Sequence, residues 1–331
     1  MQVIGLMYEA LDLNKKKINI IVATSGDTGS AAIAALKEKK NINLFVLHPH
    51  EKISNIQRKI MTTCDSYNIY NIAVKGNFDD CQKAVKQMFN DEHFREKINM
   101  SGVNSINWAR IICQIVYYFY AYFQFSSKVN FSVPTGNFGD VYAGYIAKKM
   151  GLPIDKLMVA TNENDILSRV INSGEYKPLK VKPSLSPSMD IQIASNFERL
   201  LYEVFDKSEK LTASEMLKFE VNKTLKINKD NSKDILRVFS SCKTTMDEIE
   251  KIIKDIYHSF GYVLDPHTAT GLNASRNHSD SQHLNFILST ANPIKFSDTV
   301  EKYLGNKLDL LSNFSNLFSL DERIYKVDNN I

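Results

Sequence analysis

A short polar loop near the start of the chain has the residue types of an anion-binding site. Residues 24–29 read Thr-Ser-Gly-Asp-Thr-Gly, so they offer hydroxyl groups beside accessible backbone N–H groups. The apolar residues 18–23 suit a buried parallel strand, and the alanine-rich residues 30–40 suit a helix. A helix N-terminus favours negative charge because its first N–H groups lack partners within the helix. Taken alone, the loop fits a ligand site and a plain capping turn about equally well.

Two further segments carry similar chemistry. Residues 131–140 again run from an apolar stretch into a glycine-bearing polar loop, and a helix is expected over 141–150. Two glycines beside hydroxyl and amide groups let a backbone wrap closely around a phosphate. Residues 104–110, Asn-Ser-Ile-Asn-Trp-Ala-Arg, add two amides, a hydroxyl and a guanidinium. Arg110 can fork onto a phosphate or carboxylate, although a helix cap with a surface arginine explains this segment better when it is taken alone.

Strands and helices must position these loops, and their pattern predicts the fold class. Helical stretches separate most of the apolar runs, and this alternation indicates parallel sheets with right-handed crossovers. We therefore expect an α/β protein of two parallel-sheet domains, residues 1–125 and 126–331, packed around a shared cleft. A helical elaboration of the second domain is expected over about 195–260. The predicted strands are 18–23, 44–47, 69–74, 131–133, 157–161 and 286–290.

Composition argues against several other classes of protein. The formal charge is only +4 over 331 residues and the lysines are scattered, so no nucleic-acid partner is expected. The four cysteines are far apart without a Cys-x-x-Cys pair, which argues against a zinc site or a disulfide framework. The most apolar segment, 111–125, is shorter than the roughly 20 residues of a membrane span and is expected to form a buried helix. These features favour a cytoplasmic protein without a metal site.

Taken together, the motifs resemble threonine synthase of the bacterial and fungal type, in the tryptophan-synthase-beta-like family of pyridoxal-phosphate enzymes. No single glycine loop is specific, but a series of segments in family order is. The resemblance implies the fold type II architecture of that family, with two parallel-sheet α/β domains, and pyridoxal 5'-phosphate as the cofactor. The matching segments are 23–30, 76–82, 103–110, 134–140, 187–192, 195–200, 265–269 and 289–296.

The resemblance implies an activity as well. The family converts O-phosphohomoserine and water to L-threonine and phosphate, the last step of threonine biosynthesis, so O-phosphohomoserine is the expected small-molecule partner. The sequence fits a monomer or a homodimer equally. Two alternatives stay open. One is another pyridoxal-phosphate-dependent dehydratase or lyase of the same fold, against which residues 107–110 and 188–191 argue; the other is a noncatalytic fragment that keeps its phosphate loops.

Cofactor contacts are implied for two parts of the chain. Thr290 is implied to meet the pyridine nitrogen, where a hydroxyl, unlike a carboxylate, leaves that nitrogen largely unprotonated. Asp27 stands where several related enzymes carry asparagine beside the ring hydroxyl. Backbone N–H groups implied to hold the cofactor phosphate belong to Gly136, Asn137, Phe138 and Gly139.

Substrate contacts are implied for the first half of the chain. Arg110 is expected to hold the substrate phosphate, with Thr24 and Gly26 near the carboxylate. Asp265 and His267, in a later family segment, either line the cleft or cap a turn. The full implied substrate-binding set is Thr24, Ser25, Gly26, Thr28, Asn104, Ser105 and Arg110.

One departure from the family concerns its lysine. A Phe-Lys-Asp-Phe segment there carries the lysine that forms a Schiff base with the cofactor, shortly before the helix that leads into the first strand. Residues 1–13 are expected to form an amphipathic helix, and residues 1–8 resemble the body of that family helix, so the lysine and the N-terminal region are expected upstream of Met1. Lys15, Lys16 and Lys17 are expected in a solvated turn, and Lys295 belongs to another family segment. No residue is therefore assigned the catalytic role, and the chain as given is predicted to be inactive alone.

Overall fold

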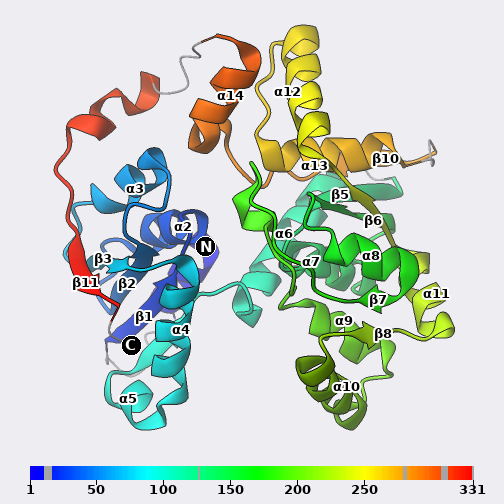
Figure 1. Ribbon diagram of the computed structural model, residues 1–331, viewed down its shortest axis with the longest axis horizontal. Coiled ribbons are helices and arrows are strands. Elements are labelled where there is room, and N and C mark those ends of the chain that lie inside the picture. Colours follow the sequence, from blue (N-terminus) through cyan, green and yellow to red (C-terminus); the bar gives the residue numbers. More distant parts are fainter. Residues whose placement is uncertain (11–16, 126, 279–281, 307–311, 330–331) are drawn as a thin grey trace. The chain divides into compact units, whose positions relative to one another are not determined.

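The computed structural model describes residues 1–10, 17–125, 127–278, 282–306 and 312–329 (Figure 1). The chain forms two compact units, one of Met1–Cys113 with Leu311–Ile331 and the other of Gln114–Leu310. Each unit is an α/β structure built on a parallel sheet, as predicted for the fold class. The units differ from the predicted division at residues 125 and 126, because residues 114–125 belong to the second unit and the C-terminal segment to the first.

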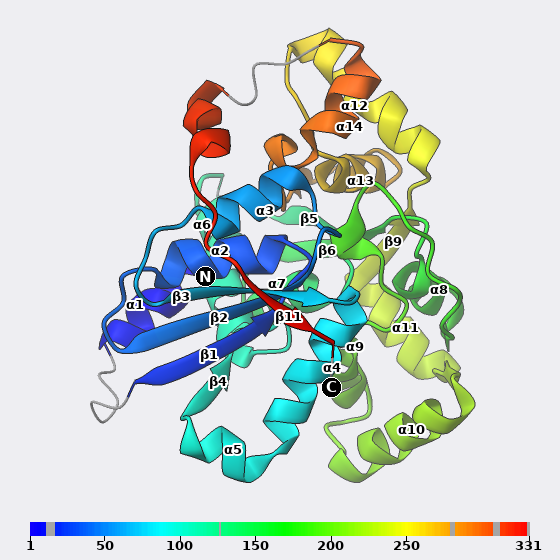
Figure 2. The same cartoon turned by 60° about the vertical axis from the view of Figure 1, so that its left-hand side comes forward.

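The first unit contains a five-stranded parallel sheet in the order β11-β3-β2-β1-β4. Three predicted strands lie in β1, β2 and β3. The edge strand β11 comes from the far end of the chain and lies beside β3, with Tyr325 opposite Ile72 (Figure 2). All four of its residues are exposed, so no apolar run marks it in the sequence. The strands are β1 (Ile18–Ala23), β2 (Ile42–Pro49), β3 (Ile69–Lys75), β4 (Met100–Gly102) and β11 (Tyr325–Asp328).

Helices cover both faces of this sheet. Side chains alternate along a strand, so Ile20 packs with Leu36 of α2 in one apolar cluster, whereas Ile21 packs with Val85 of α4 in another. The helix expected over residues 1–13 is described as α1 over Gln2–Ala10; Leu11 to Leu13, Lys15 and Lys16 lie outside the described residues. The helices are α1, α2 (Asp27–Leu36), α3 (Asn55–Thr62), α4 (Phe78–Asn90), α5 (Glu92–Lys97) and the start of α6 (Trp108–Phe123).

The C-terminal segment is tied to α3 by charge and by hydrogen bonds. Glu322 accepts a hydrogen bond from the Thr62 hydroxyl at 2.8 Å and pairs with Arg58 and Lys59. Burial raises the pKa of Glu322, but the hydrogen bonds from Thr62 and Arg58 outweigh burial, and the net pKa lies below its ordinary value. The backbone N–H of Arg323 donates to the Thr62 carbonyl at 2.7 Å. Residues after Leu311 are therefore an integral part of the first unit.

The second unit contains a four-stranded parallel sheet in the order β10-β5-β6-β9. The predicted runs 131–133 and 157–161 lie inside β5 and β6. The predicted strand 286–290 overlaps β10 only at its end, and Thr290 lies beyond the strand. Strand β9 lies within the stretch expected to be helical. The strands are β5 (Val129–Pro134), β6 (Ile154–Thr161), β9 (Phe239–Lys243) and β10 (Leu284–Ile287), with an antiparallel pair β7 (Glu175–Tyr176) and β8 (Leu225–Lys226).

Helix α6 is half-buried rather than fully buried as expected. Tyr118 is fully buried, its ring packs edge-on against Phe131 at 4.7 Å, and its hydroxyl donates to the Asp140 carbonyl at 2.9 Å. Val116 and Tyr120, on another face, are exposed. None of the described helices is long and apolar enough to cross a membrane. The other helices are α7 (Gly139–Lys149), α8 (Ile166–Ser173), α9 (Phe197–Val204), α10 (Glu209–Asn222), α11 (Lys229–Val238), α12 (Met246–Phe260), α13 (Pro266–Arg276) and α14 (Ser297–Leu304).

Candidate functional site

The second sheet brings five of the six predicted cofactor-binding residues to one edge, whereas the sixth, Asp27, lies in the first unit. Strands β5 and β10 are parallel neighbours, with Phe131 opposite Phe286, so the loops after them leave from the same edge. Residues 135–139 follow β5, and the exposed residues Ser289 and Thr290 follow β10. The carboxyl edge of a parallel sheet is where α/β proteins usually bind ligands. Of the predicted set, this edge holds the phosphate loop and Thr290.

The phosphate loop, residues 135–139, has a strained and well-anchored backbone. Phe138 has a left-handed backbone with φ of 68°, which is uncommon for a bulky residue, and its buried ring packs edge-on against Phe197 at 5.3 Å. The Asn137 side chain accepts the Gly139 N–H at 3.0 Å, and the Asn137 carbonyl accepts the Asn196 N–H at 3.0 Å. The loop therefore has a fixed shape at the start of α7.

Gly136 is the point of closest approach in this loop. A Cβ at this position would lie 2.8 Å from the carbonyl oxygen of Ser188 and 3.0 Å from Cα of Met189. Both neighbours are backbone atoms, so a side chain at Gly136 has no room. A glycine-bearing loop at the N-terminus of an 11-residue helix is the donor type that holds phosphate groups. The residues present therefore fit a phosphate-bearing cofactor.

A polar cluster supports the segment that leads to Thr290. Asp265 is buried and begins α13 by accepting the backbone N–H groups of His267 at 2.8 Å and Thr268 at 3.0 Å. The Thr268 hydroxyl donates to the same carboxylate and lies 3.4 Å from the Ser289 hydroxyl. Asp265 thus caps a helix, and through Thr268 it supports the neighbour of Thr290. The His267 ring is buried and lies 5.0 Å from Phe296.

Titration of Asp265 should be visible in the stability of the fold. Burial raises the pKa of this carboxyl, but hydrogen bonds from His267 and Thr268 outweigh burial and leave the pKa lowered. A depressed pKa stabilises the fold above the unfolded value of about 3.9, and this contribution is lost as pH falls through the folded pKa. Asp265→Ala should therefore cost about 1–2 kcal/mol in unfolding free energy near pH 6, and progressively less as the pH falls through the lowered pKa of the folded state. Urea unfolding at several pH values checks this, since a pH-independent difference would contradict it.

The first unit holds the other polar loop, residues 24–29, which follows β1 and includes the first turn of α2. The buried Thr24 hydroxyl accepts the N–H groups of Gly26 and Gly29, both at 2.9 Å, so this side chain shapes the loop. Gln57 of α3 donates to the Asp27 carboxylate at 3.2 Å and fills the space where a Gly26 side chain would lie. Helix α3 therefore braces this loop. The substrate contacts expected of Thr24 and Gly26 stay predictions.

The remaining predicted substrate residues follow β4. Because β4 pairs in parallel with β1, residues 103–105 leave the sheet at the same edge as the loop 24–29. Asn104 is exposed, and Ser105 and Arg110 are half-buried. Arg110 donates through Nη1 to the Val103 carbonyl at 3.2 Å, and the Asn107 side chain accepts the Ala109 N–H at 2.9 Å at the start of α6. The first sheet thus gathers the predicted substrate set at one edge.

Sequence reasoning missed two kinds of supporting residue. Gln57 is one, and its only local signal is the capping Ser54 three residues earlier, whose hydroxyl donates to the Gln57 side-chain oxygen at 3.0 Å. Asp190 is the other: it lies in the matched segment 187–192 but had no role assigned. Gln57 lies 30 residues from its partner Asp27, and Asp190 lies 28 and 26 residues from its partners Asn162 and Asn164, so local patterns do not reveal these contacts.

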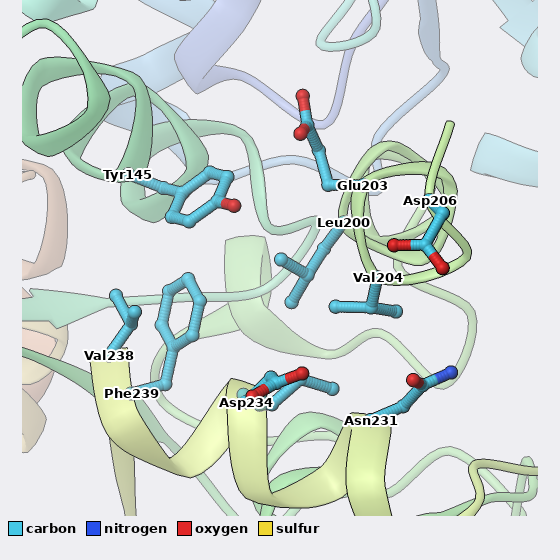
Figure 3. A pocket seen from close by; sticks show the side chains of 10 residues that line it. Tyr145, Leu200, Glu203, Val204, Asp206, Asn231, Asp234, Val238 and Phe239 are labelled. Atoms are coloured by element: carbon cyan, nitrogen blue, oxygen red, sulfur yellow. The ribbon is translucent and has the colours of Figure 1, made fainter.

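A pocket of about 230 Å³ in the second unit is lined by residues of α7, α9, α11 and the start of β9 (Figure 3). Tyr145, Leu200 and Phe239 are among its apolar walls. The acidic residues that line it, Glu203, Asp206 and Asp234, make it a poor phosphate site because like charges repel. Since no predicted site residue lines this pocket, the sheet edges remain the candidate site.

Comparisons with known proteins agree with the motifs. Residues 2–220 match the family model described as pyridoxal-phosphate dependent enzyme, and residues 268–331 match the one described as threonine synthase, C-terminal. Threonine synthase of Pseudomonas aeruginosa is 42% identical over all of this chain and 72% of its own length. The Saccharomyces cerevisiae threonine synthase is 45% identical over 91% of this chain, which spans 62% of that relative.

Solved structures of threonine synthases also match this chain. The pyridoxal-phosphate-bound threonine synthase from Brucella melitensis matches with a TM-score of 0.95 and 41% identity, covering 99% of this chain and 72% of that one. The yeast threonine synthase structure matches with a TM-score of 0.91 and 39% identity, over 99% of this chain and 72% of that one. The chain thus spans less than two thirds of the curated yeast relative and about 72% of these solved chains.

Proposed function

Since the chain belongs to the threonine synthase family of pyridoxal-phosphate-dependent enzymes, we propose that it provides the cofactor-phosphate and substrate sites for converting O-phosphohomoserine and water to L-threonine and phosphate. The observation that carries the proposal is the shared edge of β5 and β10, where a glycine loop at a helix N-terminus lies beside the loop ending in Thr290. A phosphate-bearing aromatic cofactor needs both a phosphate cradle and a partner for its ring nitrogen. We place this biosynthetic reaction in the cytoplasm.

Some residues of the chain would bind the cofactor, and others would bind the substrate. When bound, pyridoxal phosphate would withdraw electrons from carbon atoms of the substrate amino acid, so that the phosphate group of the substrate can leave. Residues 136–139 would hold the cofactor phosphate through backbone N–H groups, aided by the positive end of α7. The Thr290 hydroxyl would contact the ring nitrogen of the cofactor, and this hydroxyl carries no full charge. Arg110 would bind the substrate phosphate, since a guanidinium forks onto phosphate oxygens.

Smaller groups would orient the amino acid. Ser25 and Thr28 offer hydroxyls in the loop braced by α3, and Asn104 and Ser105 offer an amide and a hydroxyl after the neighbouring strand. The Asp27 carboxylate, held by Gln57 at 3.2 Å, would lie beside the cofactor ring in this arrangement. Direct binding tests the assignment: the full chain should bind pyridoxal phosphate in equilibrium dialysis, and O-phosphohomoserine should bind more tightly than homoserine once the cofactor is present. An absence of cofactor binding would overturn the proposal.

The printed sequence contains no Phe-Lys-Asp-Phe segment, and this bears on activity. We expect the 331-residue polypeptide to bind the cofactor without covalent attachment and to release no phosphate from O-phosphohomoserine, because a lysine is needed for attachment and for moving protons. Borohydride reduction followed by peptide mapping checks this, with a threonine synthase that carries the segment as the positive control. Stoichiometric labelling of one lysine with phosphate release would show that another lysine serves. Cofactor binding without turnover would fit the noncatalytic alternative for this polypeptide.

A further inference from the structure

A network of polar side chains surrounds Asp190, and two of its members, Asn162 and Asn164, lie just after the end of β6. Its Oδ1 accepts hydrogen bonds from the side-chain amides of Asn162 at 2.8 Å and Asn164 at 2.9 Å, and from the Ser184 hydroxyl at 2.6 Å. Its Oδ2 accepts the backbone N–H of Ser184 at 2.8 Å. Asn162 and Asn164 are almost fully buried. Four neutral donors therefore converge on one carboxylate.

Asp190 directly follows a short helical turn, residues 187–189. The Asp190 N–H donates to the Pro187 carbonyl at 3.1 Å, and the Met189 N–H donates to the Ser186 carbonyl at 2.9 Å. Met189 is buried, and its sulfur lies 3.9 Å from the Thr270 hydroxyl of α13. The turn and Asp190 thus form one anchored piece, so the position of the carboxylate fixes that of the turn.

This turn is the wall against which the phosphate loop packs. The Ser188 carbonyl oxygen and Met189 Cα lie 2.8 Å and 3.0 Å from where a Gly136 Cβ would stand. Contacts this close transmit a displacement, because packed backbone has no free volume to absorb it. A shift of the turn by a few tenths of an ångström would therefore change the space around Gly136 and the direction of its neighbours' N–H groups.

We propose that Asp190 is a positioning residue for the cofactor-phosphate loop. Its carboxylate holds the turn 187–189 against Gly136 and thereby fixes the shape of the anion site, without touching the cofactor itself. The inference rests on the proposed function, because it takes residues 136–139 to hold the phosphate. A carboxylate suits this role because its two oxygens offer about four acceptor positions, whereas an amide offers one acceptor oxygen.

The test compares variants of the full chain by their affinity for pyridoxal phosphate. Asp190→Ala should weaken binding by about tenfold or more, the usual size of effect when an outer hydrogen-bond partner is lost. Asp190→Asn should fall between this variant and the parent. The amide oxygen of the new side chain can keep three of the four hydrogen bonds. The fourth is lost, because the NH₂ group and the Ser184 N–H are both donors. Calorimetric titration gives the affinities, and the ³¹P signal of the bound cofactor should shift in Asp190→Asn.

Asn130→Ala is the matched control. Asn130 is fully buried on β5, six residues before Gly136, donates to the Asn285 side chain at 2.9 Å and accepts the Lys156 N–H at 2.9 Å. Asn130→Ala should lower the melting temperature, and Asp190→Ala should lower it as well. Asn130→Ala should leave cofactor affinity unchanged, because Asn130 lies about 20 Å along the chain from Gly136.

The outcomes separate the two proposals. Parental affinity and an unshifted ³¹P signal in the Asp190 variants, with a lowered melting temperature, would overturn the positioning role while leaving the proposed function intact. A parent chain that binds no pyridoxal phosphate would overturn the proposed function, and the inference with it. If Asp190→Ala does not fold, Asp190→Asn and Ser184→Ala decide the matter, since each keeps most of the network and should still weaken binding several-fold.

Discussion

Alanine at position 136 should cost the protein most of its affinity for pyridoxal phosphate. The added Cβ would lie 2.8 Å from the Ser188 carbonyl oxygen and 3.0 Å from Met189 Cα, and neither backbone atom can rotate away. Overpacking of this kind costs about 1–3 kcal/mol. If that strain is relieved by moving the phosphate loop, the dissociation constant should rise roughly 10- to 100-fold. Equilibrium dialysis of Gly136→Ala against the parent chain measures this.

The same chemical change at Gly261 is the control for Gly136→Ala. Gly261 ends α12 with a positive φ of 64°, and nothing lies within 4 Å of its missing Cβ. Gly261→Ala should therefore cost about 1 kcal/mol of stability through backbone strain. Its cofactor affinity should equal that of the parent. Equal affinities for all three proteins would show that residues 136–139 do not hold the phosphate.

Removal of the Arg110 guanidinium should have the largest effect on substrate binding. A charge-assisted pair between this group and the substrate phosphate is worth on the order of 2–5 kcal/mol when it is shielded from water. Arg110→Ala should therefore abolish the preference for O-phosphohomoserine over homoserine. Cofactor affinity should not change, because Arg110 is not among the predicted cofactor-binding residues. Calorimetric titration of both amino acids in the presence of pyridoxal phosphate measures the preference.

Arg95 provides a matched arginine for this experiment. Like Arg110 it lies in the first unit and donates through Nη1 to a backbone carbonyl at 3.2 Å, that of Phe89. Its other partner is Glu92, and it has no place in the predicted substrate set. Arg95→Ala should keep the preference for the phosphorylated amino acid. If Arg110→Ala also keeps it, another cation must bind that phosphate.

Elements with strong local signals were predictable from the sequence. The run 18–23 coincides with β1, and the alanine-rich stretch after the glycine loop forms α2. A parallel strand covered on both faces is rich in apolar residues, so the predicted runs 131–133 and 157–161 fall inside β5 and β6. The predicted pyridoxal-phosphate cofactor and the α/β fold are those of the family to which the chain belongs. Ordered motifs, rather than any single loop, carried that prediction.

Features that depend on distant partners were not predictable. Strand β9 reads Phe-Ser-Ser-Cys-Lys and forms a strand only because β6 offers its edge. Gln57 contacts Asp27 from 30 residues away, and Asp190 contacts Asn162 and Asn164 from 28 and 26 residues away. Local patterns thus locate the loops, whereas tertiary packing determines what holds them in shape.

Because the first unit draws on both ends of the chain, it cannot be finished early during synthesis. Its first four strands leave the ribosome long before β11, which follows roughly two hundred residues later. At about 5–20 residues per second, that interval lasts roughly 10–40 s, during which the outer edge of β3 has no neighbour. An unpaired strand edge is a template for wrong pairing with another chain. Nascent chains stalled before Glu322 should therefore depend on chaperones that shield exposed strands, and that dependence should end once β11 and its anchor to α3 have emerged.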